Sequence, residues 1–275
     1  MNIKANMDNK KFNLWNRLTA VFAFVVSAVT YLLTIEPTAS FWDCGEFIAS
    51  SYKLEVGHPP GNPVFQLIAR FFTLFGGPED AAMWVNVMSA MCSAFTIYFL
   101  YLTIVHLGRR IVEKNRGALD TPSVIAVFGA GVVGALAYTF SDTFWFSAVE
   151  AEVYAMSSLF TAVVFWAMLK WEEESDMPYA NRWIALIAFL MGISIGVHLL
   201  NLLTIPALVF IYYYKKYEVT TKRTVMVLLL SGIILAAILY GIIPYLPKFA
   251  AYFDLFFVNT LGLPFNTGAI YFAIL

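Results

Sequence analysis

Long apolar runs alternate with short polar connections along almost the whole chain. A helix needs about 20 mostly apolar residues to cross the hydrocarbon core of a bilayer. The runs that approach or exceed this length occupy residues 18–35, 82–107, 122–140, 153–171, 183–198, 200–214 and 224–243. A further run begins near Gly268, and the sequence ends inside it at Leu275. The pattern predicts an all-α fold in which residues 1–275 form a polytopic transmembrane helical bundle, and it indicates a fragment truncated within its last span.

The composition agrees with a membrane location. Hydrophobic residues make up 60% of the chain and charged residues only 13%, whereas soluble domains carry about 25% charged residues. The formal net charge of −1 argues against a nucleic-acid partner. Cys44 in a polar stretch and Cys92 in an apolar run form neither a disulfide framework nor a zinc-binding pattern. The first run could be a signal peptide, but its length and the many later spans favour an uncleaved helix.

The distribution of lysine and arginine predicts the orientation, because these residues favour cytoplasmic loops. With the N-terminus inside and the spans alternating, only Lys53, Arg70 and Lys248 of the 17 Lys and Arg residues fall outside. The first outer loop, residues 36–80, then faces the periplasm of a bacterium or the lumen of a eukaryotic compartment. We expect a multi-pass membrane protein whose outer loops carry its function.

The first outer loop contains an unusually polar stretch, Phe41–Gly61, with acids, a histidine, two prolines and Cys44, a cysteine of the exposed type. A short helix from the start of this stretch would place Asp43, Glu46 and Ser50 on one face, since they follow i, i+3, i+7 spacing. Polar residues beside hydrocarbon are costly, so the cluster is a functional hypothesis. The alternative is that Asp43 and Glu46 cap a helix and solvate the loop.

After the prolines, residues 62–75 show an amphipathic pattern. Asn62, Gln66 and Arg70 recur at every fourth position and form a polar stripe, with aromatic and aliphatic residues between them. The segment is too short to span a bilayer, so we expect a short interfacial helix with Arg70 at headgroup depth. A guanidinium there suits the phosphate of a lipid-linked substrate, and snorkelling to lipid headgroups is the alternative.

Further outer connections carry polar residues to the same face. Residues 141–152 include Glu150 and Glu152, the turn at residues 198–201 includes His198 and Asn201, and another connection begins near Pro244. Carboxylates at a low-dielectric boundary have raised pKa values and can act as bases, which suits activation of a hydroxyl nucleophile.

Structural roles are the alternatives for these residues. Glu150 and Glu152 would pair with outer cations, His198 and Asn201 would satisfy backbone groups at a helix break, and His58 would be a turn residue. The chain has no HExxH, glycine-rich phosphate loop, GxSxG or CxxC motif. Metalloprotease, nucleotide-hydrolase and serine-hydrolase activities therefore lack support.

Three segments carry a family resemblance: FWDCGEFIASSYKLEVGHPPGNP, SDTFWFSAVEAEVYA and GVHLLNLLTIPAL, in this order. Together they resemble a family of bacterial membrane proteins that is related to vertebrate protein O-mannosyltransferases. The resemblance covers nearly all of the chain. It implies the GT-C fold, that is, a polytopic glycosyltransferase in the bacterial inner membrane with its site facing the periplasm. It also implies a polyprenyl-phosphate-linked sugar as donor, a protein Ser/Thr or glycan hydroxyl as acceptor, surrounding membrane lipids, and neither cofactor nor metal.

The resemblance assigns roles to the outer residues. Asp43 would be the general base, with Glu46 as the second candidate catalytic residue. The acceptor hydroxyl would attack the anomeric carbon, and the lipid phosphate would leave with inversion. The candidate substrate-binding residues are His58, Arg70, Lys53, Glu150, Glu152, His198 and Asn201. A transporter or flippase of a lipid-linked glycan is the main alternative, but acids gathered at one face rather than at the midplane favour an enzyme. A non-catalytic scaffold is the third interpretation.

Overall fold

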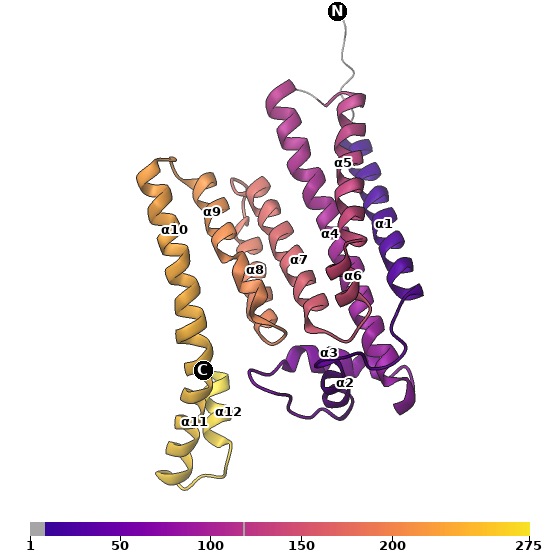
Figure 1. Ribbon diagram of the computed structural model, residues 1–275. Helices are drawn as coiled ribbons and strands as arrows, with labels where there is room; N and C mark the ends of the chain where they lie inside the picture. Colours follow the sequence, from indigo (N-terminus) through magenta and orange to yellow (C-terminus); the bar gives the residue numbers. More distant parts are fainter. Residues whose placement is uncertain (1–8, 118) are drawn as a thin grey trace, which may run out of the picture. The chain divides into compact units, whose positions relative to one another are not determined.

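A computed structural model gives the structure of residues 9–117 and 119–275 (Figure 1). Of the described residues, 80% are helical and none lies in a β-strand. Among the described residues, five helical segments are long and apolar enough to cross a membrane: Asn9–Leu33, Pro78–Arg116, Thr121–Thr139, Val153–Glu174 and Thr221–Asn259. The predicted all-α polytopic bundle is therefore confirmed. The chain divides into two compact units, Met1–Thr204 and Ile205–Leu275, which are described separately.

The first unit contains the long helices and three short helices beside them. Its α-helices are α1 (Asn9–Leu33), α2 (Cys44–Lys53), α3 (Pro63–Thr73), α4 (Ala81–Arg116), α5 (Thr121–Thr139), α6 (Asp142–Ala148), α7 (Val153–Glu174) and α8 (Asn181–Ile195). Two 3₁₀ turns, η1 (Pro78–Asp80) and η2 (Leu199–Thr204), precede α4 and follow α8. The predicted span at 183–198 corresponds to α8, whose 15 residues rise only about 22 Å, less than the thickness of a bilayer core.

Helix α4 is the central element of this unit, since it packs against α1, α5 and α7. Its buried face carries small residues, among them Ala90, Ser93 and Ala94, which allow neighbouring backbones to approach closely. Helix α5 also approaches α4 closely, at Gly131. A Cβ atom at Gly131 would lie 2.7 Å from Val105 and 2.8 Å from Tyr101. Close packing around α4 thus holds the long helices in one bundle.

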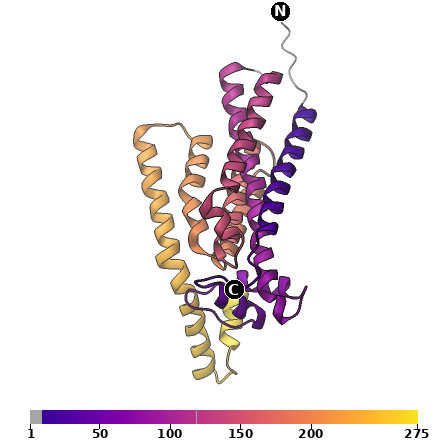
Figure 2. The same cartoon turned by 45° about the vertical axis from the view of Figure 1, so that its right-hand side comes forward.

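One end of this bundle carries α2 and α3, which lie across it (Figures 1 and 2). Hydrogen bonds join the connections there. The Glu36 amide donates to the Val149 carbonyl over 3.1 Å, and the Val64 amide donates to the Gly196 carbonyl over 2.8 Å. The loop after α1, the loop before α7 and the end of α8 therefore meet at the same end of the first unit.

Helix α2 begins later than the sequence pattern indicated. It starts at Cys44 rather than Phe41, and Asp43 is its N-cap residue without a side-chain capping bond. Trp42 has a positive φ of 62°, which a helix cannot accommodate. The predicted common face is also wrong in part, because Ser50 is buried while Glu46 is exposed.

Helix α3 confirms the predicted short helix at residues 62–75, but its faces are used differently than expected. Asn62 and Gln66 are buried toward the protein. The opposite face exposes Leu67 and Phe71, by 62% and 58%. An amphipathic helix at a membrane interface turns its apolar face to lipid, so α3 places its polar stripe beside α2.

The second unit contains α9 (Ile205–Lys216), α10 (Thr221–Ala236), the π-helical η3 (Ala237–Ile242), α11 (Ile243–Asn259) and α12 (Thr267–Ile274). The predicted span at 200–214 corresponds to α9, with only 12 residues. The predicted outer connection near Pro244 is wrong, since helix continues through it to Asn259. Pro244 stands in the first turn of α11, directly after the π-helical turn. Proline is tolerated there because an N–H group at this position, next to the π-helical turn, would make no regular α-helical hydrogen bond.

Candidate active site

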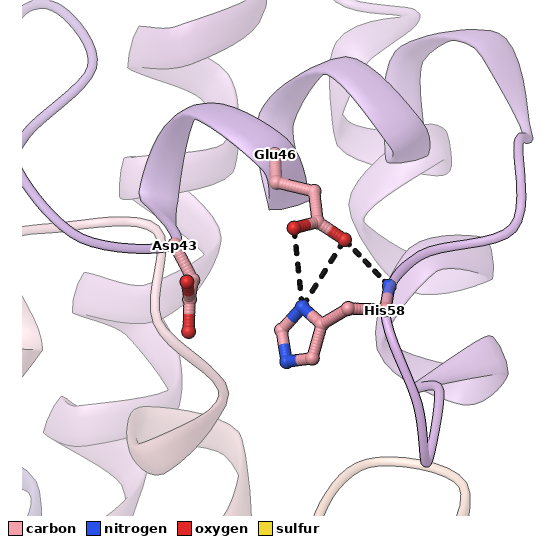
Figure 3. Close-up of side chains that lie close together, drawn as sticks. All are labelled: Asp43, Glu46 and His58. Atoms are coloured by element: carbon pink, nitrogen blue, oxygen red, sulfur yellow. Dashed lines mark hydrogen bonds and ion pairs between the residues drawn. The ribbon is translucent and has the colours of Figure 1, made fainter.

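A group of three side chains lies at the start of α2: Asp43, Glu46 and His58 (Figure 3). The His58 amide donates to Glu46 Oε1 over 2.6 Å, and His58 Nδ1 lies 3.1 Å from both carboxylate oxygens. The His58 ring also stacks on Phe47, with 5.9 Å between ring centroids. Glu46 therefore anchors the proline-containing loop to α2, and these hydrogen bonds lower the pKa of Glu46.

Asp43 differs from Glu46 in its surroundings. Its carboxylate accepts no side-chain or backbone hydrogen bond from the described residues, although its backbone carbonyl accepts from Phe47. The side chain is exposed at the N-terminal end of α2. Of the two predicted catalytic acids, Asp43 is therefore the one whose oxygens are open to an incoming group.

The same three side chains have the geometry of a cation site. One ligand atom from each of Asp43, Glu46 and His58 lies within 4.8 Å of the others. Carboxylate oxygens and imidazole nitrogens are ligands that Zn²⁺ accepts. All three side chains are exposed, and His58 already occupies both oxygens of Glu46. The spacing alone is compatible with a metal ion, which the sequence-based prediction did not include, but the His58–Glu46 contact accounts for the arrangement without one.

Two buried acids lie behind this group. Glu150 and Glu152 are only 4% and 8% exposed. Cys44 Sγ donates to Glu152 Oε1 over 3.6 Å, and Ser40 contacts Glu150. Burial raises the pKa of both carboxyl groups, and the negative charge of Asp43 raises that of Glu152 further. No lysine or arginine in the described residues forms an ion pair with either acid, so pairing with outer cations is not what the structure shows.

Cys44 is the residue whose environment the sequence analysis misjudged. It is fully buried, not a cysteine of the exposed type. Burial, with the two neighbouring carboxylates as the next cause, raises the pKa of its thiol to about 12. A thiol that stays protonated serves as a hydrogen-bond donor rather than a nucleophile. In the sequence, only its position next to Asp43 indicated that Cys44 belongs to the candidate site.

Polar residues from α3 complete the support of the loop. Gln66 Nε2 donates to Ser50 Oγ over 3.0 Å, and both amide atoms of Asn62 are buried with no partner in the described part of the chain. A Cβ atom at Gly57 would lie 3.1 Å from Glu46 Oε1 and 3.2 Å from Gln66 Nε2. A side chain at this position would therefore push against the ends of Glu46 and Gln66.

The two predicted phosphate-binding cations lie at the other end of α2. The Arg70 guanidinium stacks over Tyr52 at 4.9 Å and donates to Thr73 Oγ1 over 3.1 Å. Lys53 pairs with Glu55 at 3.8 Å in an exposed position. Ten residues of helix separate Asp43 from Lys53, which corresponds to about 15 Å. The structure therefore does not bring these cations together with Asp43.

The last two predicted residues make contacts within the bundle. His198 Nδ1 accepts from the Leu200 amide over 3.1 Å, and burial lowers the pKa of His198. Asn201 is fully buried. Its amide group donates to Ser194 Oγ over 2.9 Å and accepts from Thr161 Oγ1 over 3.3 Å. These bonds support the helix break after α8, and neither of them joins Asn201 to Asp43, Glu46 or His58.

The fold and the site define a multi-pass membrane protein with an acidic cluster at one end of its helical bundle. The family model described as the N-terminal domain of protein O-mannosyl-transferase TMEM260 matches residues 43–221. Because this match includes more than half of the chain, the chain belongs to that family.

Two curated relatives extend this result. Protein O-mannosyl-transferase TMEM260 of Mus musculus is 26% identical over 176 residues, which are 64% of this chain and 22% of that protein. The Dictyostelium discoideum protein of the same name is 23% identical over 236 residues, or 83% and 27% of the two chains. The chain thus spans about a quarter of the length of these relatives. No solved structure matches it significantly.

Proposed function

We propose that this chain forms the catalytic membrane part of a GT-C-type glycosyltransferase. It would move a sugar, by analogy with its relatives a mannose, from a polyprenyl-phosphate carrier to a protein hydroxyl group on the outer membrane face. Membership of a family whose relatives are named protein O-mannosyl-transferases supports the reaction class. The observation that carries the proposal is the open carboxylate of Asp43, which stands at the bundle end where the acidic loops meet.

Asp43 is the general base of this reaction. A base needs a free oxygen within hydrogen-bond distance of the proton that it removes. Glu46 meets this condition less well than Asp43, because the His58 ring and amide already contact its oxygens. Asp43 takes the proton of the acceptor hydroxyl, whose oxygen forms a bond to the anomeric carbon. The bond from that carbon to the carrier phosphate breaks, and its electron pair leaves with the phosphate, so the configuration inverts.

His58 is the donor that assists the leaving phosphate. The attacked carbon lies between the acceptor oxygen and a phosphate oxygen, so the phosphate lies across the reacting sugar from the base, within a few ångströms of the same group. Lys53 at the end of α2, and Arg70 of α3, which stacks over the neighbouring Tyr52, stand too far from Asp43 for this role, whereas His58 belongs to the same group as Asp43. A protonated His58 donates from Nδ1 to Glu46 and presents Nε2–H to the phosphate. Arg70 and Lys53 then contact lipid headgroups near the carrier.

The buried acids hold the start of α2, and with it Asp43, in position. Glu152 accepts from Cys44, the first residue of α2, directly after Asp43. This contact ties the start of α2 to the loop before α7 and so fixes the position of the base. Glu150 and Glu152 are therefore positioning residues rather than direct substrate ligands, and His198 lies at the same bundle end without a contact to the Asp43 group.

The test is sugar transfer by the full-length protein in proteoliposomes with a polyprenyl-phosphate sugar. Asp43→Asn keeps the shape of the side chain but removes the base, so transfer is expected to fall by at least about 100-fold. Asp142→Asn is the matched control, because Asp142 is an exposed acid in the first turn of α6 at the same bundle end. Near-normal transfer by Asp43→Asn, or an equal loss in the control, would end the assignment.

A further inference from the structure

A second site lies at the opposite end of the first unit. A cavity of about 400 Å³ opens between the N-terminal half of α1, the second half of α4 and the C-terminal half of α7. Along α4, His106 in this cavity stands 20 residues after Asn86, which contacts the loop after α1. That separation corresponds to about 30 Å, the thickness of a bilayer core. The cavity is thus distinct from the Asp43 group.

The walls of the cavity carry an excess of positive charge. Arg17, Arg109 and Lys170 line it, and Glu173 is the only acid among the described residues that line it. Lys170 pairs with Glu173 at 2.6 Å, and Arg109 pairs with Glu113 at 2.7 Å. No hydrogen bond or ion pair within the described part of the chain engages the Arg17 guanidinium. The cavity therefore keeps one cation without a counter-ion.

Buried polar atoms in the same cavity also lack partners. His106 has a side chain only 10% exposed, with Nδ1 3.1 Å from Glu173 Oε1. Its Nε2 atom is buried and has no hydrogen-bond partner among residues 9–117 and 119–275, and the same is true of Oδ1 of Asn16. Buried polar atoms normally have a partner. Because Nδ1 of His106 lies at Glu173, Nε2 is the ring atom that remains for a ligand in the cavity, such as a phosphate group.

The remaining walls are apolar and indicate the kind of anion. Tyr98, Leu102 and Trp166 continue the cavity toward the middle of the bundle. A small inorganic anion gains nothing from such walls, whereas the glycerol and first acyl carbons of a lipid would bury apolar surface there. Basic pockets between membrane helices bind anionic lipid headgroups in this way.

We propose that the cavity between α1, α4 and α7 binds the phosphate-bearing headgroup of an anionic phospholipid, with Arg17 and His106 as the phosphate ligands. Arg109 and Lys170 stand at the same rim, held by their acidic partners. This inference is independent of the proposed transferase activity, because it concerns the other end of the bundle.

The test uses native mass spectrometry of the full-length protein in a neutral detergent. The protein is titrated with phosphatidylglycerol, with phosphatidylcholine and with inorganic phosphate. We expect a saturable phosphatidylglycerol adduct that phosphatidylcholine does not match and millimolar phosphate does not displace. Arg17→Gln is expected to weaken this adduct about tenfold or more, since a charge-assisted phosphate contact is lost. Arg17 is exposed and unpartnered within the described residues, so the variant is expected to fold.

Lys114→Gln is the matched control, because Lys114 is an exposed cation of the same α4 end that does not line the cavity. Its adduct is expected to equal that of the parent. Equal binding of phosphatidylglycerol and phosphatidylcholine would overturn the proposal, and so would equal weakening in Arg17→Gln and Lys114→Gln. Displacement of the lipid by inorganic phosphate would identify a free anion as the ligand and would also overturn it.

Discussion

Asn86 holds the segment that leads from α1 to the candidate active site. It is a buried residue of α4, only 1% exposed. Its Nδ2 group donates to the carbonyl oxygens of Glu36 and Thr38, over 2.6 Å and 3.1 Å. A neutral hydrogen bond contributes about 0.5–1.5 kcal/mol net, so losing both is expected to lower the free energy of unfolding by about 1–3 kcal/mol. Asn86→Ala tests this value.

Asn86→Asp tests the direction of the bonds. It replaces the NH₂ donor with an oxygen, so a carboxylate would face two carbonyl oxygens inside the protein. An unpaired buried charge is more costly than a missing donor, and Asn86→Asp is therefore expected to be less stable than Asn86→Ala. The assay is reversible unfolding in mixed detergent micelles, followed by far-UV circular dichroism. Asn181→Ala, at the exposed start of α8, is the control. An Asn86→Ala protein as stable as the parent, or an Asp variant more stable than the Ala variant, would refute the reasoning.

Further predictions concern the buried acid and two pairs of glycines. Burial raises the folded-state pKa of Glu152 above its unfolded value of about 4.3. The free energy of unfolding of the parent should therefore fall as the pH rises from the unfolded pKa to the folded-state pKa. Glu152→Gln should reduce this fall, as seen in melting temperatures between pH 4 and 8. Gly57→Ala should lower sugar transfer because its methyl group meets polar side chains at 3.1–3.2 Å, whereas Gly45→Ala, with open space, should not. Gly131→Ala should lower the free energy of unfolding by about 1–3 kcal/mol, whereas Gly129→Ala, whose methyl group meets nothing within 4 Å, should not lower it, because alanine suits a helix interior better than glycine.

The positions of the helices follow mostly from local sequence. The long helices α1, α4, α5 and α7 lie where apolar runs of sufficient length predicted them, because a segment in lipid must satisfy its own backbone hydrogen bonds. The prediction failed where a local rule had an exception. Pro244 was read as a break, yet the π-helical turn before it lets the helix continue. Trp42 was placed in a helix, yet its positive φ delays the start of α2 to Cys44.

The side-chain environments at the candidate site depended on tertiary structure. The sequence by itself determined that Asp43, Glu46, His58 and Glu152 belong to polar connections between spans. Only the fold decided that His58 would bind both oxygens of Glu46 and leave Asp43 open, and that Glu152 would lie buried beside Cys44. Cys44 and Glu152 are more than a hundred positions apart in the sequence and are hydrogen-bonded here. A local sequence pattern does not reveal such a contact. The physical reason is that burial and partner choice are set by which helices pack against α4.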